Sequence, residues 1–93
     1  ILADWADVLV GAQNGDFGGE PDRLIARALA LEPDNVKALA LAGTAAFQRD
    51  DYAGASAHWE RILAQVPPGD EAYGSIVASI NEARRMGGMP LLD

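Results

Sequence analysis

The chain contains no cysteine, a single histidine and few aromatic residues. Without a thiol it can form no disulfide, no Cys-ligated zinc site and no cysteine nucleophile, although this absence leaves the cellular compartment open. His58 stands beside Trp59 on an expected helix, which favours a surface or rim histidine over a metal ligand. The acidic pairs Asp50-Asp51 and Asp70-Glu71 fall at expected turns, where helix capping explains them. We therefore expect no catalytic residue, no metal site and no cofactor.

Positive charge is also scarce, because seven Lys and Arg residues face 14 Asp and Glu residues, for a net charge of -7. Nucleic-acid binding rests on clustered basic side chains, so this composition argues against it and against contact with anionic membrane surfaces. No apolar run reaches the roughly 18 residues of a membrane span, and no signal-peptide pattern is present. At 93 residues and 49% hydrophobic content, we expect one globular domain. Since the chain begins at Ile1, we interpret it as a piece of a longer protein.

Small residues dominate the middle of the chain, in the stretch "LALAGTAAFQRDDYAGASAHW" over residues 39–59. Alanine and glycine bury little surface per residue, so a helix built from them needs a neighbour very close to it. We expect Gly43, Ala46 and Ala55 to mark the crossing of two paired helices, with Trp59 filling the space beyond them. A larger side chain at Gly43 should overpack this crossing.

An internal repeat appears at an offset of 34 residues, where Trp5, Leu39 and Tyr73 share one register. Each period contains two helical patterns, which gives two helix pairs and one closing helix. The sequence predicts helices over Leu2 to Gln13, Pro21 to Leu31, Val36 to Gln48, Ala53 to Val66 and Glu71 to Met86.

Capping residues delimit these helices. Asp34, Asp51 and Asp70 precede three of the predicted helices and can accept from their free amides. Pro21 suits the first turn of its helix, and Gly87-Gly88 should end the last one. The remaining tail can fold back onto the closing helix or fray, and we favour fraying because chain ends without a pairing element are usually mobile.

The pattern of small and large residues resembles the tetratricopeptide repeat (TPR). The matching residues are Leu39, Ala42, Gly43 and Ala46, then Ala55, Trp59 and Pro67, with Trp5 as the aromatic of the preceding unit. The resemblance implies an all-α, right-handed α-α superhelix of two TPR helix pairs plus a capping helix. Repeat 1 would span about 2–35, repeat 2 about 36–69, the capping helix about 70–86 and the tail 87–93, all in a single domain.

The TPR resemblance also implies a concave groove lined by the first helix of each pair. Small, weakly polar residues there leave room for a helix or an extended chain, but in a fragment they can equally have packed against missing neighbours. Some TPR domains bind the C-terminal tail of a chaperone and hold its terminal carboxylate with basic residues of the groove. Lys37 is the one basic residue among the groove positions here, so we do not expect chaperone-tail binding. The expected groove residues are Ala3, Ala6, Val10, Gln13, Asn14, Lys37, Ala40, Thr44, Phe47, Gln48, Glu71, Gly74, Ala78, Asn81 and, beside them, Glu82.

Residues 24–72, together with "SINEAR" at 79–84 and Glu20-Pro21, resemble more narrowly the TPR domain of CycH-type (CcmI) c-type cytochrome biogenesis proteins. This resemblance implies a periplasmic binding module, not an enzyme, tethered to the inner membrane by segments absent from this chain. Its partners would be the C-terminal helix of apocytochrome c and the haem ligation machinery. The alternative is a general TPR scaffold for self-association, as in a homodimer, or for assembly of a multiprotein complex.

Overall fold

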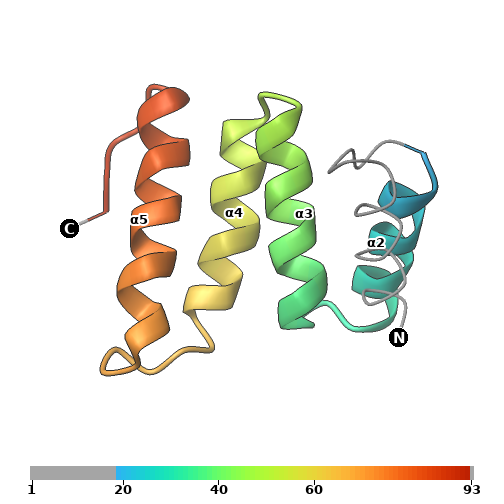
Figure 1. The fold of residues 1–93 in the computed structure, drawn as a ribbon, viewed down its shortest axis with the longest axis horizontal. Coiled ribbons are helices and arrows are strands. Elements are labelled where there is room, and N and C mark those ends of the chain that lie inside the picture. Colours follow the sequence, from blue (N-terminus) through green and yellow to red (C-terminus); the bar gives the residue numbers. More distant parts are fainter. Residues whose placement is uncertain (1–18, 93) are drawn as a thin grey trace.

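The computed structural model describes residues 19–92, and within that range it contains four α-helices and no strand. They are α2 (Glu20–Leu31), α3 (Val36–Gln48), α4 (Tyr52–Leu63) and α5 (Glu71–Met86). Each helix packs against the next along the chain, so that α3, α4 and α5 stand side by side with α2 beyond α3 (Figure 1). The predicted all-α class is confirmed, and the serial packing is consistent with a helical repeat. The helix predicted over residues 2–13 lies outside the described residues.

The start of α3 differs from the prediction in its capping residue. Asn35, not Asp34, is the N-cap, and its Oδ1 accepts a hydrogen bond from the Ala38 amide at 2.9 Å. An N-cap stands directly before the first helical residue, and Asp34 is one position too early for that reach. The Asp34 carboxylate instead accepts from Arg61 of α4 at 2.9 Å, so it joins the α2–α3 turn to α4.

The two later caps agree with the prediction, whereas the end of α4 does not. Asp51 accepts from the Gly54 amide at 3.0 Å, and Asp70 accepts from the Ala72 amide at 2.9 Å. Helix α4 ends at Leu63, three residues before the predicted end at Val66. Val66 precedes a proline, which disfavours the α conformation there, so the last residues form a tighter turn in which the Val66 amide donates to the Leu63 carbonyl.

Helix α5 ends at Met86 with Gly87 as its C-cap, as predicted, and Gly88 adopts the left-handed conformation with a φ of 73°. This turn sends the tail back along α5 (Figure 1). The Asn81 side chain donates to the Leu92 carbonyl at 3.3 Å and accepts from the Leu92 amide at 2.7 Å, while Arg84 donates to the Pro90 carbonyl at 3.0 Å. The expectation that the tail frays is wrong for these residues, because α5 supplies the pairing groups that the tail would otherwise lack.

The crossing of α3 and α4 is as close as the small residues indicate. A Cβ atom placed on Gly43 would overlap the Trp59 indole, whose atoms are the three nearest to it. Ala46 and Ala55 form one buried cluster with Ala83 of α5, and Trp59 packs against that cluster. The expected crossing at Gly43, with Trp59 in the space beyond, is therefore confirmed.

A polar network joins α4, α5 and the tail. Ser56 is 2% exposed and donates to Glu60 Oε2 at 2.7 Å. The other carboxylate oxygen of Glu60 accepts from Arg84 at 2.9 Å, and Arg84 also holds the tail through Pro90. Because the network links three segments, it fixes the position of α5 against α4.

Gly43→Ala should destabilise the protein by about 1–3 kcal/mol, since the added methyl group overlaps the Trp59 indole. Gly74→Ala is the matched control, because it also lies within a helix but no atom would come within 4 Å of its Cβ. The control should gain about 0.5–1 kcal/mol from the higher helix propensity of alanine. Urea unfolding of both variants measures the difference, and equal stability would contradict the close crossing.

Arg84→Ala should lower the free energy of unfolding by about 1.5–3 kcal/mol, because it leaves Glu60 without its cation and releases the tail. Arg85→Ala is the control, since Arg85 makes only an exposed pair with Glu82 and should cost less than about 1 kcal/mol. Thermal unfolding of the two variants gives the comparison. Similar losses of stability in both variants would show that the network stabilises the protein no more than an exposed ion pair does.

Candidate partner-binding groove

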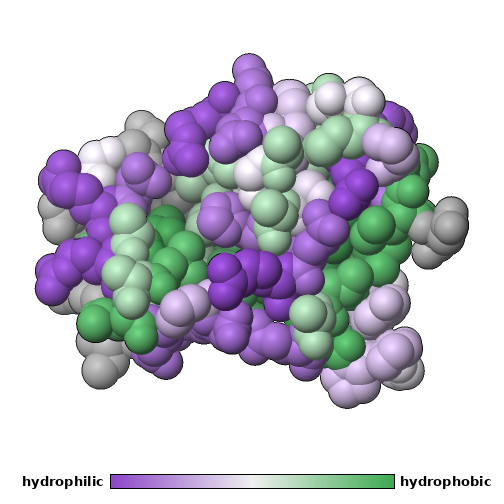
Figure 2. Space-filling model, turned by 180° about the vertical axis from the view of Figure 1, so that it is seen from behind, coloured by the Kyte–Doolittle hydropathy of each residue, from purple (hydrophilic) through white to green (hydrophobic). Residues whose placement is uncertain are grey.

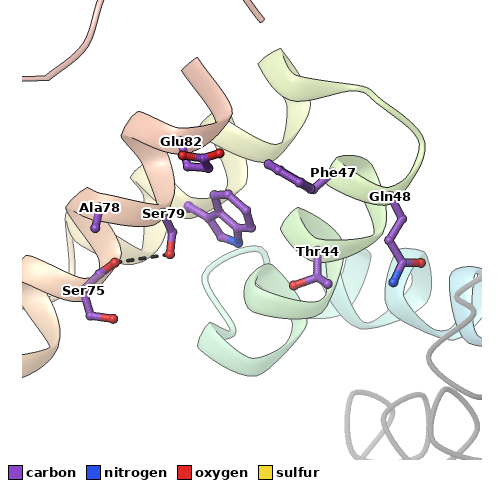
Figure 3. Close-up of a pocket in the computed structure, with 8 residues that line it drawn as sticks. Thr44, Phe47, Gln48, Ser75, Ala78, Ser79 and Glu82 are labelled. Carbon is purple, nitrogen blue, oxygen red and sulfur yellow. Dashed lines mark hydrogen bonds between the residues drawn. The ribbon is translucent and has the colours of Figure 1, made fainter. Parts of the chain in front are cut away.

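Helices α3 and α5 flank α4 and run in the same direction, opposite to that of α4 (Figure 1). Between them lies a hollow of about 600 Å³. Figure 3 shows the lining side chains of α3 on one side of it and those of α5 on the other. Its lining consists of Thr44, Phe47 and Gln48 from α3, Trp59 from α4, and Ser75, Ala78, Ser79 and Glu82 from α5.

A second hollow of about 220 Å³ adjoins the first, because Thr44, Trp59, Ser75 and Ser79 line both. Its other lining residues are Ala40, Ile62 and Ile76. The two hollows form one continuous depression, which we call the α3–α5 groove. It extends from the aromatic and acidic residues near the ends of α3 and α5 towards aliphatic residues nearer their starts.

Aromatic rings form part of the groove and pack against one another. The Phe47 and Trp59 ring centroids lie 6.0 Å apart, with their planes tilted by 32°. Phe47 also makes an edge-to-face contact with Tyr52, with centroids 5.2 Å apart. Such contacts fix the rings in place, so the groove is largely preformed.

Two of the hydroxyl groups that line the groove are hydrogen-bonded within their own helices. Thr44 donates to the Ala40 carbonyl at 3.0 Å, and Ser79 donates to the Ser75 carbonyl at 3.2 Å (Figure 3). These bonds turn the hydroxyl protons back onto the backbone. The walls therefore present small, weakly polar surface, which suits the apolar face of another helix better than a strongly hydrated ligand.

The structure brings together one part of the residues expected in a groove. Ala40, Thr44, Phe47, Gln48 and Ala78 line the α3–α5 groove, as does Glu82. Lys37, Glu71 and Gly74 are exposed but are not among the lining residues, and Asn81 binds the backbone of Leu92 in the tail. The expected residues Ala3, Ala6, Val10, Gln13 and Asn14 lie outside the described residues.

Residues from α4 and a shifted face of α5 were missed as groove residues. Trp59 and Ile62 of α4 also line the groove, so the helix between α3 and α5 supplies part of its surface. On α5 the lining follows the i, i+3, i+4, i+7 spacing of Ser75, Ala78, Ser79 and Glu82. That spacing can be read from the sequence, but the TPR register shares only Ala78 and Glu82 with this face and misses Ser75 and Ser79.

His58 belongs to a separate hollow of about 210 Å³ between α2, α3 and α4, which also includes the exposed pair Asp22–Arg49. Burial lowers the pKa of His58 below its ordinary value; nearby Asp51 opposes this shift, while Arg61 and Arg49 add to it. Within residues 19–92 no group of three or more His, Asp or Glu side chains is arranged to hold a metal ion. Across the same residues, no helix has the length and apolar character needed to cross a bilayer.

His58, the one histidine of the chain, should titrate below pH 6.5 in an NMR experiment, because burial disfavours its charged form. The unfolded chain then binds this proton more readily than the folded one, so stability should fall as the pH drops through 6.5. His58→Gln should lack that component, which a comparison of unfolding at pH values of about 5.5 and 7.5 measures. A pKa at or above the ordinary value would contradict the prediction.

No family model matches the chain, and no solved structure matches it either. The cytochrome c-type biogenesis protein CycH of Pseudomonas aeruginosa is 33% identical to it over 84 residues, which cover 90% of this chain and 21% of that protein. The chain thus spans about a fifth of the length of the curated relative that it matches. The expected resemblance is confirmed: over nine-tenths of its length, this chain is similar to a segment of the cytochrome c-type biogenesis protein CycH.

Proposed function

We propose that this chain is a protein-interaction module of c-type cytochrome biogenesis, whose α3–α5 groove receives the C-terminal helix of an apocytochrome c. The similarity to CycH supports the biogenesis role. The continuous groove of small walls and aromatic residues supports a helical occupant, and it is the observation that carries the proposal. No catalytic step is required, because binding alone would hold the partner chain.

The dimensions of the groove suit a short helical contact. Its lining on α3 runs from Ala40 to Gln48, which corresponds to about 12 Å of helix, or roughly two turns. Thr44 lies on the α3 wall and Ala78 on the α5 wall (Figure 3), and their small size lets a third helix approach α3 and α5 closely. An amphipathic helix would insert apolar side chains towards Phe47 and Trp59 at intervals of three or four residues.

In this proposal the helix pairs act as TPR units in the periplasm, and segments outside this chain tether them to the inner membrane. The bound apocytochrome would remain accessible to the haem ligation machinery. The CycH similarity supports this placement, because that relative is named for cytochrome c-type biogenesis. The groove contributes shape and apolar surface rather than reactive groups.

Ala78→Arg should weaken binding of a peptide with the C-terminal helix sequence of a c-type cytochrome by about tenfold or more, because the new side chain fills the groove. Ala57→Arg is the matched control, since Ala57 is an exposed alanine of α4 that does not line the groove. Calorimetric titration gives both affinities. Failure of the unmodified chain to bind at high micromolar peptide concentration would contradict the proposal, as would equal weakening by both substitutions.

Self-association is the second candidate function, and exposed hydrophobic side chains at the two ends of the row of helices favour it. Leu31 and Val36 are 72% and 48% exposed at the α2–α3 turn, and Met86 and Leu91 are 50% and 54% exposed near the end of α5. Figure 2 shows hydrophobic areas on the α2 side and on the α5 side, separated by polar side chains. Sedimentation distinguishes the two functions: a tight dimer that Leu31→Arg or Met86→Arg disrupts, and that Ala78→Arg leaves intact, would favour self-association through these ends.

A further inference from the structure

The two ends of the α3–α5 groove differ in chemistry. At one end Phe47 and Glu82 lie on opposite walls (Figure 3), and Trp59 contributes to the lining between α3 and α5. At the other end the lining includes Ala40, Ile62 and Ile76. Within residues 19–92, no Lys, Arg or His lines either hollow of the groove.

We propose that the aromatic end of the groove receives a lysine or arginine side chain of the bound helix, an inference that rests on the proposed function. Aromatic rings attract cations through the negative charge above their faces, and a carboxylate beside them adds direct attraction. The long aliphatic stem of a lysine or arginine packs on apolar surface while its head reaches a polar group. Phe47, Trp59 and Glu82 supply these two environments in one hollow. The net charge of -7 favours the approach of a cationic partner.

Glu82 already has a cation beside it in the free protein, because Arg85 of the same helix donates to its carboxylate. The side chains of this pair are 66% and 46% exposed, and an exposed ion pair contributes little stability. An incoming cation can therefore replace Arg85 at Glu82 at small cost. Arg85 acts as an internal competitor for the proposed site.

The spacing of the two ends sets a register for the partner. Ala40 and Phe47 are seven residues apart on α3, which is about 10 Å along the helix axis. A bound helix that lies along the groove has the same rise per residue. Its cationic residue and an aliphatic residue should therefore be seven positions apart, two turns along one face.

Two designed amphipathic helices test the inference. Both peptides carry a leucine seven residues before and another seven residues after a central position, so that the helix can bind in either direction. The central residue is lysine in one peptide and norleucine in the other. The lysine peptide should bind about 5- to 30-fold more tightly than the norleucine peptide, the range expected for a partly desolvated cation on aromatic rings. The preference should shrink in Glu82→Gln, which leaves only the aromatic rings to attract the cation, and increase in Arg85→Gln. Glu32→Gln removes the same charge from the far end of α2, outside the groove, and should leave the preference unchanged.

The outcomes separate this inference from the proposed function when an apocytochrome C-terminal helix is titrated alongside. Equal affinity of the two designed peptides, no binding of either, or a lysine preference that Glu82→Gln leaves undiminished would overturn the cation site. If the apocytochrome helix still binds in those cases, the proposed function stands without it. If only the lysine peptide binds, the cation site holds and the cytochrome partner is wrong.

Discussion

The contact between Gly43 and Trp59 is the constraint on which the other features depend. Because Gly43 has no side chain, α3 and α4 approach closely enough for the indole to lie against the α3 backbone. The same indole then lines the groove beside Phe47. One close crossing thus provides both the packing between two helices and part of the surface that is proposed to hold a partner. A substitution that displaces the indole should therefore affect both the stability of the fold and the binding of a partner.

The order and bounds of the helices could largely be predicted, because residues that begin or end a helix act locally and do not depend on distant contacts. Proline, glycine and capping residues mark where helices begin and end. Three of the described helices begin directly after a residue that caps the helix through its side chain. The errors arose where two solutions were close in energy. Asp34 and Asn35 can both cap, and only the first helical residue decides between them. The tail was misjudged because its hydrogen bonds to Asn81 and Arg84 join residues that the sequence alone does not pair.

The groove was harder to predict because it depends on how three helices sit together. On α3, where the predicted register starts at the correct residue, Ala40, Thr44 and Phe47 all line the groove. On α5 the rotation of the helix about its axis is set by its contact with α4, and this contact turns Asn81 towards the tail. The TPR register assigns groove residues only to the first helix of each pair. It therefore omits Trp59 and Ile62, which belong to the second helix, α4. The separation of the groove into an aromatic end and an aliphatic end likewise emerges only in three dimensions.

The most direct measurement is an NMR experiment on the folded chain that detects nuclear Overhauser effects between the Trp59 indole protons and the α-protons of Gly43. The close crossing predicts strong effects, because the indole lies directly over the position that a Cβ atom would occupy. It also predicts weaker effects from the indole to groove residues such as Thr44. An indole that shows no effect to Gly43 and that is fully open to solvent would contradict the account, since neither the packing nor the groove would then exist.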